Sequence, residues 1–412
     1  MSELSYLEKL LDGVEVEWLP LAKVCRLING RAYKQEELLS KGKYPVLRVG
    51  NFFTNQNWYY SDLELDQDKY CDNGDLLYAW SASFGPRIWH GGKSIYHYHI
   101  WKVVPDSNLI CKQFLYYLLQ WDTKALKDAH STGSTMMHIS KTTIEKRLVP
   151  IPCPDNPEKS LAIQSEIVRI LDKFTALTAE LTAELTAELN MRKKQYNYYR
   201  DQLFSFKESE VEWKTLGEIG HFTRGKRFVK TDMLSEGYPC IHYGEMYTYY
   251  NVWTNKTKSF VSHELASKLR VSEYGDVIIV AAGETIEDIG KGTAWLGKSN
   301  VVFHDACFSY RCLLNPKYIA YFTRTKIFHD QIKKHISSGK ISAINANGLS
   351  KVKIPMLSEK EQARIVDILD KFDTLTNSIT EGLPREIELR QKQYEYYRDL
   401  LFSFPKPETV SN

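Results

Sequence analysis

One stretch of the sequence has the residue types and the spacing of a nucleotide-binding loop. Residues 292–299, GTAWLGKS, satisfy the pattern G-x-x-x-x-G-K-[ST], in which backbone N–H groups, a lysine and a hydroxyl group hold phosphates. Such a loop ends a strand and opens a helix, whereas the residues after it here, NVVFHDACF, have the character of a strand. The first half of the chain aligns residues 92–94 with residues 297–299 but lacks the first glycine. We therefore interpret both copies as hairpin turns.

Other patterns point less clearly to chemistry. Residues 315–318, NPKY, lack the second proline of the N-P-P-Y tetrapeptide of adenine methyltransferases, and no glycine-rich cofactor loop precedes them. His97 and His99 would share one face of a strand, where they could form a metal pair, but ordinary strand packing is the simpler explanation. The sequence contains no H-E-x-x-H, no G-x-S-x-G and no spaced carboxylate–lysine nuclease cluster. We therefore predict that no residue of this chain is catalytic and that none binds a metal.

The composition is that of an ordinary globular protein. The 412 residues suffice for two or three domains, and 43% of them are hydrophobic and 25% charged. Seven cysteines without a Cys-x-x-Cys pair argue for reduced thiols and against a zinc site. We find no apolar run of membrane-spanning length and no signal-peptide pattern in MSELSYLEKLLDG, so we expect a cytoplasmic protein without a membrane partner. The net charge of +3 decides nothing about nucleic acid.

The chain contains an internal repeat. RKKQYNYYRDQLFSF (residues 192–206) returns as RQKQYEYYRDLLFSF (residues 390–404), and ILDKF at Ile170 returns at Ile368. The segments before these repeats, here called the interiors, are similar only in pattern: YPVLRVGNF corresponds to YPCIHYGEM, and GDLLYAW corresponds to GDVIIVA. The chain therefore has two closely similar repeated segments, here called the frames, and two interiors that differ in sequence.

The frames are predicted to be long helices. Apolar residues recur every four positions through the exact repeat TAELTAELTAEL and again in the second copy, at Leu375, Ile379, Leu383 and Ile387. Four residues turn a helix by roughly 400°, so each row forms a slowly slanting stripe. We predict an antiparallel coiled coil of two long helices with a kink at Pro384. The alternative is two independent amphipathic helices packed on separate cores.

The interiors are predicted to be mixed α/β domains of roughly 140 residues, a normal domain size. Short β-branched and aromatic runs, such as YPVLRV, DLLYAW and DVIIVAA, alternate with turns that contain glycine and asparagine. The fold class is therefore mixed α/β, with two β-rich domains separated by the helices and related by a pseudo-twofold repeat. The predicted boundaries are 1–157 for the first domain, 158–207 for the central helical region, 208–356 for the second domain and 357–412 for the C-terminal helical region.

Polar loops lie at the same place in both halves. RGKRFVK concentrates four cations beside an aromatic ring, and STGSTMMHISK and ISSGKISAINAN offer hydroxyl, amide and basic groups. Such groups contact phosphates and base edges of DNA. Solvated loops with a stray basic cluster are the alternative, but the recurrence favours a DNA contact.

The two variable domains, the near-identical helical regions and the central TAEL repeats resemble the specificity subunit of type I restriction–modification enzymes, most closely the IC-type branch. The resemblance covers the whole chain. It implies that each variable domain reads one half of a split double-stranded DNA sequence. It also implies that the helical regions hold two modification subunits, which methylate adenine, and that two restriction or motor subunits join them. S-adenosylmethionine, ATP and Mg are then expected on these partners and not on this chain.

The resemblance also suggests which residues contact the partners. The loops at 132–141 and 338–347 are expected near DNA, and four residues near strand ends are candidate base readers: Arg48, Asn51, His242 and Glu245. The full set of candidate DNA-binding residues is Arg48, Asn51, Arg87, Thr132, Ser134, Thr135, His138, Lys141, Arg224, Lys226, Arg227, His242, Glu245, Ser338, Lys340, Asn345 and Asn347. The candidate subunit-interface residues are Leu177, Leu181, Leu185, Leu189, Tyr196, Tyr199, Tyr394 and Tyr397.

Two other classes of function compete with this interpretation. A coiled-coil adaptor with two protein-binding domains would keep the frames but would give the paired polar loops no role. A solitary nuclease or NTPase would need GKS to be catalytic. For the TAEL repeat we predict a spacing role, in which its length sets the number of unread base pairs between the two half-sites.

Overall fold

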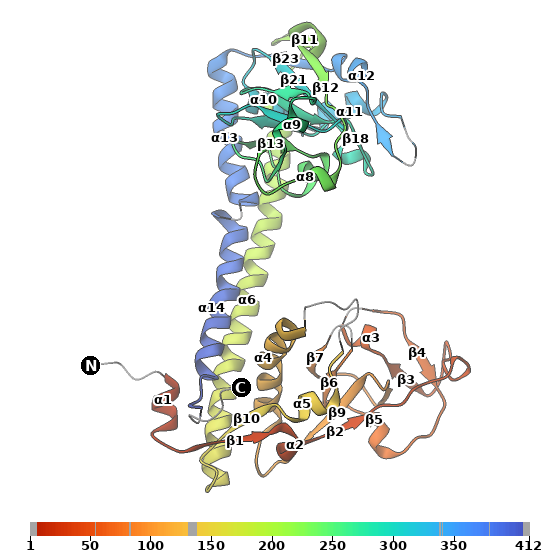
Figure 1. Ribbon diagram of the computed structural model, residues 1–412, viewed down its shortest axis with the longest axis vertical. Helices are drawn as coiled ribbons and strands as arrows, with labels where there is room; N and C mark the ends of the chain where they lie inside the picture. Colours follow the sequence, from red (N-terminus) through yellow and green to blue (C-terminus); the bar gives the residue numbers. More distant parts are fainter. Residues whose placement is uncertain are drawn as a thin grey trace. The chain divides into compact units, whose positions relative to one another are not determined.

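The computed structural model describes residues 6–53, 55–81, 84–130, 138–337, 339, 341–378 and 380–406, with the backbone alone at 128–130. The chain divides into two compact units. The first unit contains residues up to 182 together with those from 389 onward, and the second contains residues 183–388. Each unit combines a mixed α/β domain with part of the helical frame (Figure 1). The predicted fold class is confirmed.

The first domain is built on two four-stranded sheets, with strand orders β2-β9-β6-β7 and β4-β3-β8-β5, and a ribbon of β1 and β10. Their strands are β1 (Val16–Pro20), β2 (Cys25–Asn29), β3 (Tyr44–Leu47), β4 (Tyr59–Ser61), β5 (Tyr70–Cys71), β6 (Leu76–Ala79), β7 (Gly85–Ile88), β8 (Ser94–Tyr96), β9 (Ile100–Pro105) and β10 (Leu148–Pro152). β3 and β8 are parallel, and the other ladders of these sheets are antiparallel.

The second domain repeats this plan with additions. A five-stranded sheet has the order β12-β21-β17-β19-β14, a four-stranded sheet has the order β15-β13-β20-β16, and two-stranded ribbons join β11 to β23 and β18 to β22. Their strands are β11 (Glu212–Thr215), β12 (Gly220–Arg224), β13 (Tyr238–Ile241), β14 (Trp253–Thr254), β15 (Ser259–Val261), β16 (Val271–Ser272), β17 (Val277–Val280), β18 (Ala282–Gly283), β19 (Gly292–Trp295), β20 (Val301–Phe303), β21 (Cys307–Cys312), β22 (Ser342–Ala343) and β23 (Lys353–Met356).

Helices complete each domain. Those of the first are α1 (Tyr6–Leu11), α2 (Leu21–Val24), α3 (Val49–Phe53), α4 (Lys112–His130), α5 (Lys141–Glu145) and the 3-10 turns η1 (Gln35–Glu37) and η2 (Gln67–Lys69). Those of the second are α7 (Leu216–Ile219), α8 (Tyr243–Thr248), α9 (His263–Ala266), α10 (Pro316–Phe322), α11 (Lys326–Lys333), α12 (Ala346–Ser350), η3 (Lys230–Asp232) and η4 (Ile286–Asp288).

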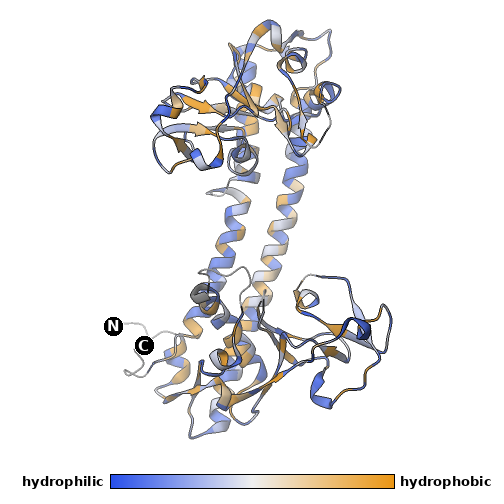
Figure 2. Cartoon of the chain, turned by 45° about the vertical axis from the view of Figure 1, so that its right-hand side comes forward, coloured by the Kyte–Doolittle hydropathy of each residue, from blue (hydrophilic) through white to orange (hydrophobic). Residues whose placement is uncertain are grey.

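The frame consists of α6 (Pro157–Leu203), α13 (Glu359–Asn377) and α14 (Gly382–Leu401). In the first unit Phe174 of α6 stacks on Tyr397, and in the second unit Tyr199 of α6 stacks on Phe372. Residue numbers on the contacting helix therefore fall as those of α6 rise, as an antiparallel pair requires. The hydropathy colours of the frame helices mix along their length, whereas the strands are more uniformly hydrophobic (Figure 2).

The kink predicted at Pro384 is wrong. The helix ends after Asn377, and a new helix begins at Gly382. Gly382 has a φ of +79°, and a Cβ there would meet the carbonyl oxygen of Thr374, so this position requires glycine. Pro384 lies in the first turn of α14, where its missing N–H removes no helical hydrogen bond. Ile379 lies outside the described residues.

The interpretation of both GKS copies as hairpin turns is wrong. β7 and β8 belong to different sheets, and so do β19 and β20, so each turn carries the chain from one sheet to the other. Trp89 donates its indole N–H to the carbonyl of Gly92 at 3.0 Å, and Trp295 donates to Ser299 at 2.9 Å. A Cβ on Gly91 or on Gly297 would meet the ring of that tryptophan. Gly91, not Gly92, is therefore equivalent to Gly297. A strand, β20, does come after the motif as predicted.

Candidate nucleic-acid interface

Each domain is attached to its frame helix by a buried glutamine, and the two glutamines make equivalent hydrogen bonds. Gln164 accepts a hydrogen bond from the N–H of Cys111 at 2.9 Å, and Gln362 accepts one from the N–H of Asn315 at 2.8 Å. Both side chains are buried, so these bonds are shielded from water. The two glutamines are separated by the same interval as Ile170 and Ile368, so they are equivalent in the repeat. Their partners lie at the starts of α4 and α10.

A tyrosine makes a second attachment at equivalent places. The hydroxyl of Tyr117 donates to Asp172 at 2.6 Å, and that of Tyr321 donates to Asp370 at 2.6 Å. Burial and the adjacent carboxylate raise the pKa of both tyrosines, so both hydroxyls are protonated donors at neutral pH. Together with the glutamines, these bonds set the position of each domain on its own helix.

The aromatic ends of the frame segments enter the domain cores. Phe402 and Phe404 lie 6.1 and 6.3 Å from Phe114, measured between ring centroids, and belong to the main core of the first unit. In the second unit Phe204 lies 4.9 Å from Tyr318. The repeated FSF sequence is therefore a docking element for the domains.

The second domain contains a cleft of 680 Å³ at the ends of its strands. Its polar lining includes both signs of charge and two histidines; the residues are Arg227, Phe228, Val229, Lys230, His242, Tyr243, Tyr247, Ala282, Gly283, Glu284, Thr285, Asp288, His304, Asp305, Ala306 and Ile341. They come from the segments that follow β12, β13 and β20, including α8, and from the β18–β22 ribbon and η4. Such a set offers donors and acceptors to a polar ligand.

Local hydrogen bonds determine which ring nitrogen carries the proton in each of the two histidines of the cleft. Nδ1 of His242 accepts from the N–H of Gly244 at 3.2 Å, and Nδ1 of His304 accepts from the N–H of Ala306 at 3.1 Å. Burial lowers the pKa of His242 to about 4 and also lowers that of His304. Both imidazoles are therefore neutral at pH 7, with the proton on Nε2, and that N–H is a hydrogen-bond donor.

The first domain gathers an aromatic and histidine cluster at the corresponding strand ends. His99 lies 4.8 Å from Trp80 and 6.4 Å from His138, and His97 lies 4.9 Å from His99. Residues 97–99 form the turn between β8 and β9, so the prediction that these two histidines share a strand face is wrong. Burial lowers the pKa of His97 to about 4. Within the described residues, no three histidine, cysteine or acidic side chains gather as metal ligands.

The predicted cationic DNA contacts are exposed. They are Arg48, Arg87, Lys141, Arg224, Lys226 and Arg227. Some also make internal contacts: Arg224 donates to the carbonyl of Asp305 at 3.0 Å, and Lys226 donates to that of Lys268 at 2.8 Å. Arg48 lies over the ring of Tyr59 at 5.3 Å. These cations are partly pre-oriented.

Several other predicted residues have structural partners. Asn51 donates to the carbonyls of Asn55 and Asn57, and Glu245, which is buried, accepts from Ser259. Asn345 caps α12 by accepting from Gly348 at 2.8 Å. These contacts explain why the three residues are present even if none of them contacts DNA, since turns and helix starts require such polar groups.

The remaining predicted DNA-binding residues divide into two groups. His138 and Asn347 are exposed. Five lie outside the described residues: Thr132, Ser134, Thr135, Ser338 and Lys340.

The predicted subunit-interface residues differ in exposure. Leu177, Tyr199 and Tyr397 are exposed, Leu181, Leu185, Leu189 and Tyr394 are half-buried, and Tyr196 is buried. Sequence reasoning missed Tyr198 and Tyr396, which are equivalent in the repeat and each 60% exposed. The signal was the middle tyrosine of both QYxYYRD motifs. Large aromatic side chains exposed at equivalent positions are typical of contact sites.

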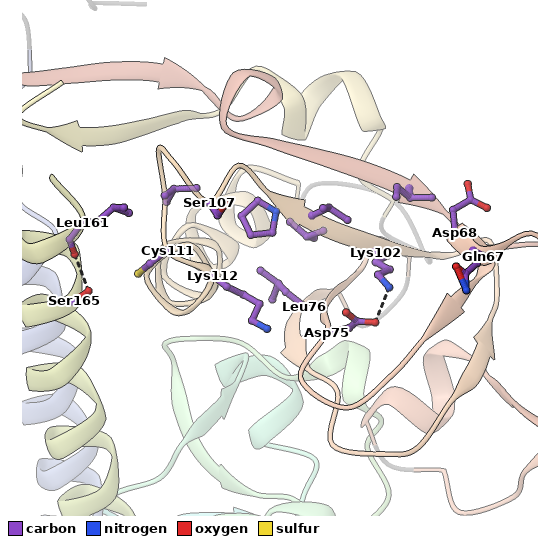
Figure 3. A pocket seen from close by; sticks show the side chains of 15 residues that line it. Gln67, Asp68, Asp75, Leu76, Lys102, Ser107, Cys111, Lys112, Leu161 and Ser165 are labelled. Atoms are coloured by element: carbon purple, nitrogen blue, oxygen red, sulfur yellow. Dashed lines mark hydrogen bonds and ion pairs between the residues drawn. The ribbon is translucent and has the colours of Figure 1, made fainter. Parts of the chain in front are cut away.

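The first domain has a separate cavity of 850 Å³ beside α6 (Figure 3). Lys102 and Asp75 form an ion pair of 2.7 Å within it, and Leu161 and Ser165 of α6 line its opposite side. Asp75 precedes β6, whereas Trp80 of the aromatic cluster comes after it, so the cavity and the cluster lie at opposite ends of that strand.

Among the helices that the structure describes, none is both long and apolar enough to cross a membrane.

Comparison with known proteins identifies the family. Residues 14–191 and 208–389 match the family model of the type I restriction modification DNA specificity domain. The chain is 42% identical to the type I restriction enzyme EcoR124I/EcoR124II specificity subunit of Escherichia coli, over 100% of both chains. It is 37% identical to the EcoprrI specificity subunit of Escherichia coli, over 92% of this chain and 93% of that one.

A solved structure has a similar fold. Its subject is complex assembly and conformational transition of the type I R-M system, and the TM-score is 0.67 at 15% identity, with 94% of this chain and 97% of that one covered. Two matches of the same family model in one chain agree with the two domains and their duplicated frame. The chain belongs to the family of type I restriction–modification specificity subunits.

Proposed function

We propose that this chain is the sequence-specific DNA-binding subunit of a type I restriction–modification complex and that each domain reads one half of a bipartite duplex target. The observation that carries the proposal is the duplicated attachment: the same glutamine and tyrosine bonds hold two domains whose polar strand ends carry different side chains. Two domains that are attached in the same way but present different side chains are suited to a target made of two different half-sites.

The exposed side chains support a DNA contact. Arginine and lysine near the strand ends of both domains can neutralise phosphates, and the neutral His242 N–H group can donate to a base edge. The small net charge of +3 suits a subunit that shares phosphate contacts with its partners. The coiled-coil adaptor is the competing function, and it would give these strand-end groups no ligand.

The frame is proposed to hold two modification subunits, with Tyr198 and Tyr396 at the centres of the two contacts. Restriction or motor subunits join through that assembly. Adenine methylation, S-adenosylmethionine, ATP and Mg then belong to the partners. We propose the domain boundaries 1–157, 158–207, 208–356 and 357–412 for exchange experiments, because the frame repeats resume at these junctions.

The test is to assemble the chain with its modification subunits and to map methylated adenines in random duplexes by sequencing. We expect methylation confined to a split sequence with two fixed half-sites and an unread spacer. Methylation without sequence preference, or a complex that does not bind duplex DNA, would contradict the proposal and favour the adaptor.

A further inference from the structure

Resting on the proposed function, we propose that each domain reads bases at one duplicated centre and that Arg48 and Asp305 are its specificity-determining side chains. The reading centre is defined by the turn after β8 or β20 (residues 97–99 and 304–306) and by the first residue after β3 or β13 (Arg48 and His242). Its ligand is the base edges of duplex DNA.

The backbone of the reading centre is the same in both domains. The N–H of His97 donates to the carbonyl of Leu47 at 2.9 Å, and the N–H of His304 donates to that of Ile241 at 3.1 Å. These bonds hold the histidine turn beside the end of the neighbouring strand. Arg48 and His242, the next residues along those strands, therefore occupy equivalent positions.

A glycine closes the reading centre on one side in each domain. Gly30 donates its N–H to Ile100 at 3.1 Å, and Gly225 donates to Cys307 at 3.0 Å. A Cβ on either glycine would meet backbone carbonyl oxygens at the histidine turn, so both positions require glycine for close approach.

The residue three positions after each glycine is aromatic, and its ring packs on the histidine of the turn. Tyr33 lies 6.4 Å from His97, and Phe228 lies 5.3 Å from His304. The glycine, the aromatic residue and the histidine are thus common to two domains that differ elsewhere. Their recurrence identifies them as the shape of the reading centre and leaves discrimination to the positions that differ.

The segments before α5 and α12 close the other side. Ile139 donates its N–H to Trp80 at 3.0 Å, and Ile344 donates to Ala281 at 2.8 Å. The described ends of the two polar loops, at Ile139 and Ile344, therefore lie beside the reading centre.

Three equivalent positions of the reading centre carry different chemistry. Arginine at 48 corresponds to histidine at 242, tyrosine at 98 to aspartate at 305, and tryptophan at 80 to alanine at 281. The exchanged side chains differ in charge, size and hydrogen-bonding groups, whereas the surrounding backbone bonds are unchanged. Two readers of different sequences need this combination.

Arg48 is suited to read guanine. Its side chain is exposed, and its guanidinium lies over the ring of Tyr59 at 5.3 Å, which limits the orientations of its plane. Arginine donates two parallel hydrogen bonds to O6 and N7 of guanine, the commonest specific contact in the major groove. A pre-oriented guanidinium loses less entropy when it makes such a contact.

Asp305 is suited to read cytosine. Its side chain is 36% exposed, and the bond from Arg224 to its carbonyl holds its backbone. Oδ1 lies 3.1 Å from Nδ1 of His304, but that nitrogen accepts from Ala306 and burial lowers the pKa of the imidazole, so no ion pair forms at neutral pH. The carboxylate is left as an acceptor, the group that pairs with N4 of cytosine.

The test uses the assembled methyltransferase and base preferences at each position of both half-sites. Arg48→Gln should move one position of the first half-site from guanine toward adenine, because glutamine pairs with adenine. Asp305→Asn should move one position of the second half-site from cytosine toward adenine. For Arg48→Gln, preference for guanine should fall roughly 5- to 150-fold, the range of one bidentate base contact. For Asp305→Asn, preference for cytosine should fall toward the lower end of that range, because the carboxylate accepts one hydrogen bond from N4.

Matched controls make the same charge changes in the same domains. Arg26→Gln removes an exposed cation on β2, and Glu264→Gln removes an 84% exposed carboxylate on α9. Both should leave every base preference unchanged. If Arg48→Gln methylates too weakly to be mapped, Arg48→Ala should relax the same position in duplex selection by the complex.

The outcomes separate two failures. Unchanged preferences in both Arg48→Gln and Asp305→Asn, with methylation intact, would overturn the reading centre while leaving the proposed function standing. A change in the wrong half-site would overturn it too. If the unaltered complex shows no split recognition sequence, the proposed function itself fails.

Discussion

Asp276, the residue before β17, is predicted to be a main electrostatic support of the second domain. Its side chain is 3% exposed, and its carboxylate accepts from Nε and Nη2 of Arg311 at 2.7 and 2.8 Å and from the N–H of Glu273 at 2.8 Å. The hydroxyls of Ser272 and Ser309 lie at 3.2 Å. Asp276→Asn keeps the shape but turns an amide N–H₂ toward some of these donors.

The expected cost is about 3 kcal/mol. Breaking a buried ion pair costs about 3–5 kcal/mol, and the 44% exposure of the Arg311 side chain lets water solvate the released cation, so we take the lower end. In a unit of this size, about 200 residues, the melting temperature then falls by about 6–12 °C.

The repeat supplies a matched control. Asp75 is the equivalent residue of the first domain and pairs with Lys102 at 2.7 Å, but its side chain is 28% exposed. Asp75→Asn should cost about 1 kcal/mol, because its carboxylate is partly exposed to water, which screens the ion pair.

The effect should also depend on pH. Burial alone would raise the pKa of Asp276, but the hydrogen bonds from Arg311 and Glu273 outweigh it and hold the pKa below its usual value. The stabilisation is therefore present above the pKa of the unfolded chain and is lost as the pH falls through the lower folded pKa. Thermal unfolding of the full chain in its complex, followed by calorimetry between pH 7 and acid, measures both. Equal destabilisation by Asp276→Asn and Asp75→Asn would refute this reasoning.

The frame and the turns between sheets support four further predictions. Tyr321→Phe removes the hydrogen bond to Asp370, which keeps its ion pair with Lys317. Stability in urea unfolding should therefore fall by about 1.5–3 kcal/mol, the range for hydrogen bonds to charged groups; an unchanged midpoint would contradict this. Deleting residues 186–189 shortens α6 by about 6 Å and rotates the rest of the helix by roughly 40° beyond a full turn, close to the twist of one base pair, so mapped sites should lose one spacer base pair. Replacing residues 208–356 with a relative's second domain should change one half-site. Lys298→Ala should leave ATP hydrolysis by the complex intact, since a Lys298-dependent ATPase requires a helix where β20 lies.

The frame was predictable from sequence because it depends on local spacing. Apolar residues at every fourth position specify a helix, and a repeat of 198 residues between Ile170 and Ile368 specifies which segments are equivalent. The interruption before Gly382 was not predicted, because the sequence pattern points to the proline as the breaker. Proline is compatible with the first turn of a helix, whereas the positive φ of Gly382 is a property of three-dimensional structure.

The strand ends were less predictable, because they depend on partners far along the chain. His97 and His99 alternate like strand residues, yet β8 ends at Tyr96, and the N–H of His97 bonds to Leu47. The GKS turns likewise look like hairpins until strand partners are known. Tyr198 and Tyr396 could have been found from sequence, since both copies of the motif contain them.

The reading centre explains how the interiors can differ while the frame stays the same. The bonds that hold it join backbone groups, such as the N–H of His304 and the carbonyl of Ile241, and backbone bonds do not depend on side-chain type. The two glycines keep those backbones close, and an aromatic ring, Tyr33 or Phe228, packs on the histidine. Substitution at Arg48 or Asp305 therefore changes the groups presented to a base without changing the bonds that hold the fold, so recognition can diverge while stability is kept.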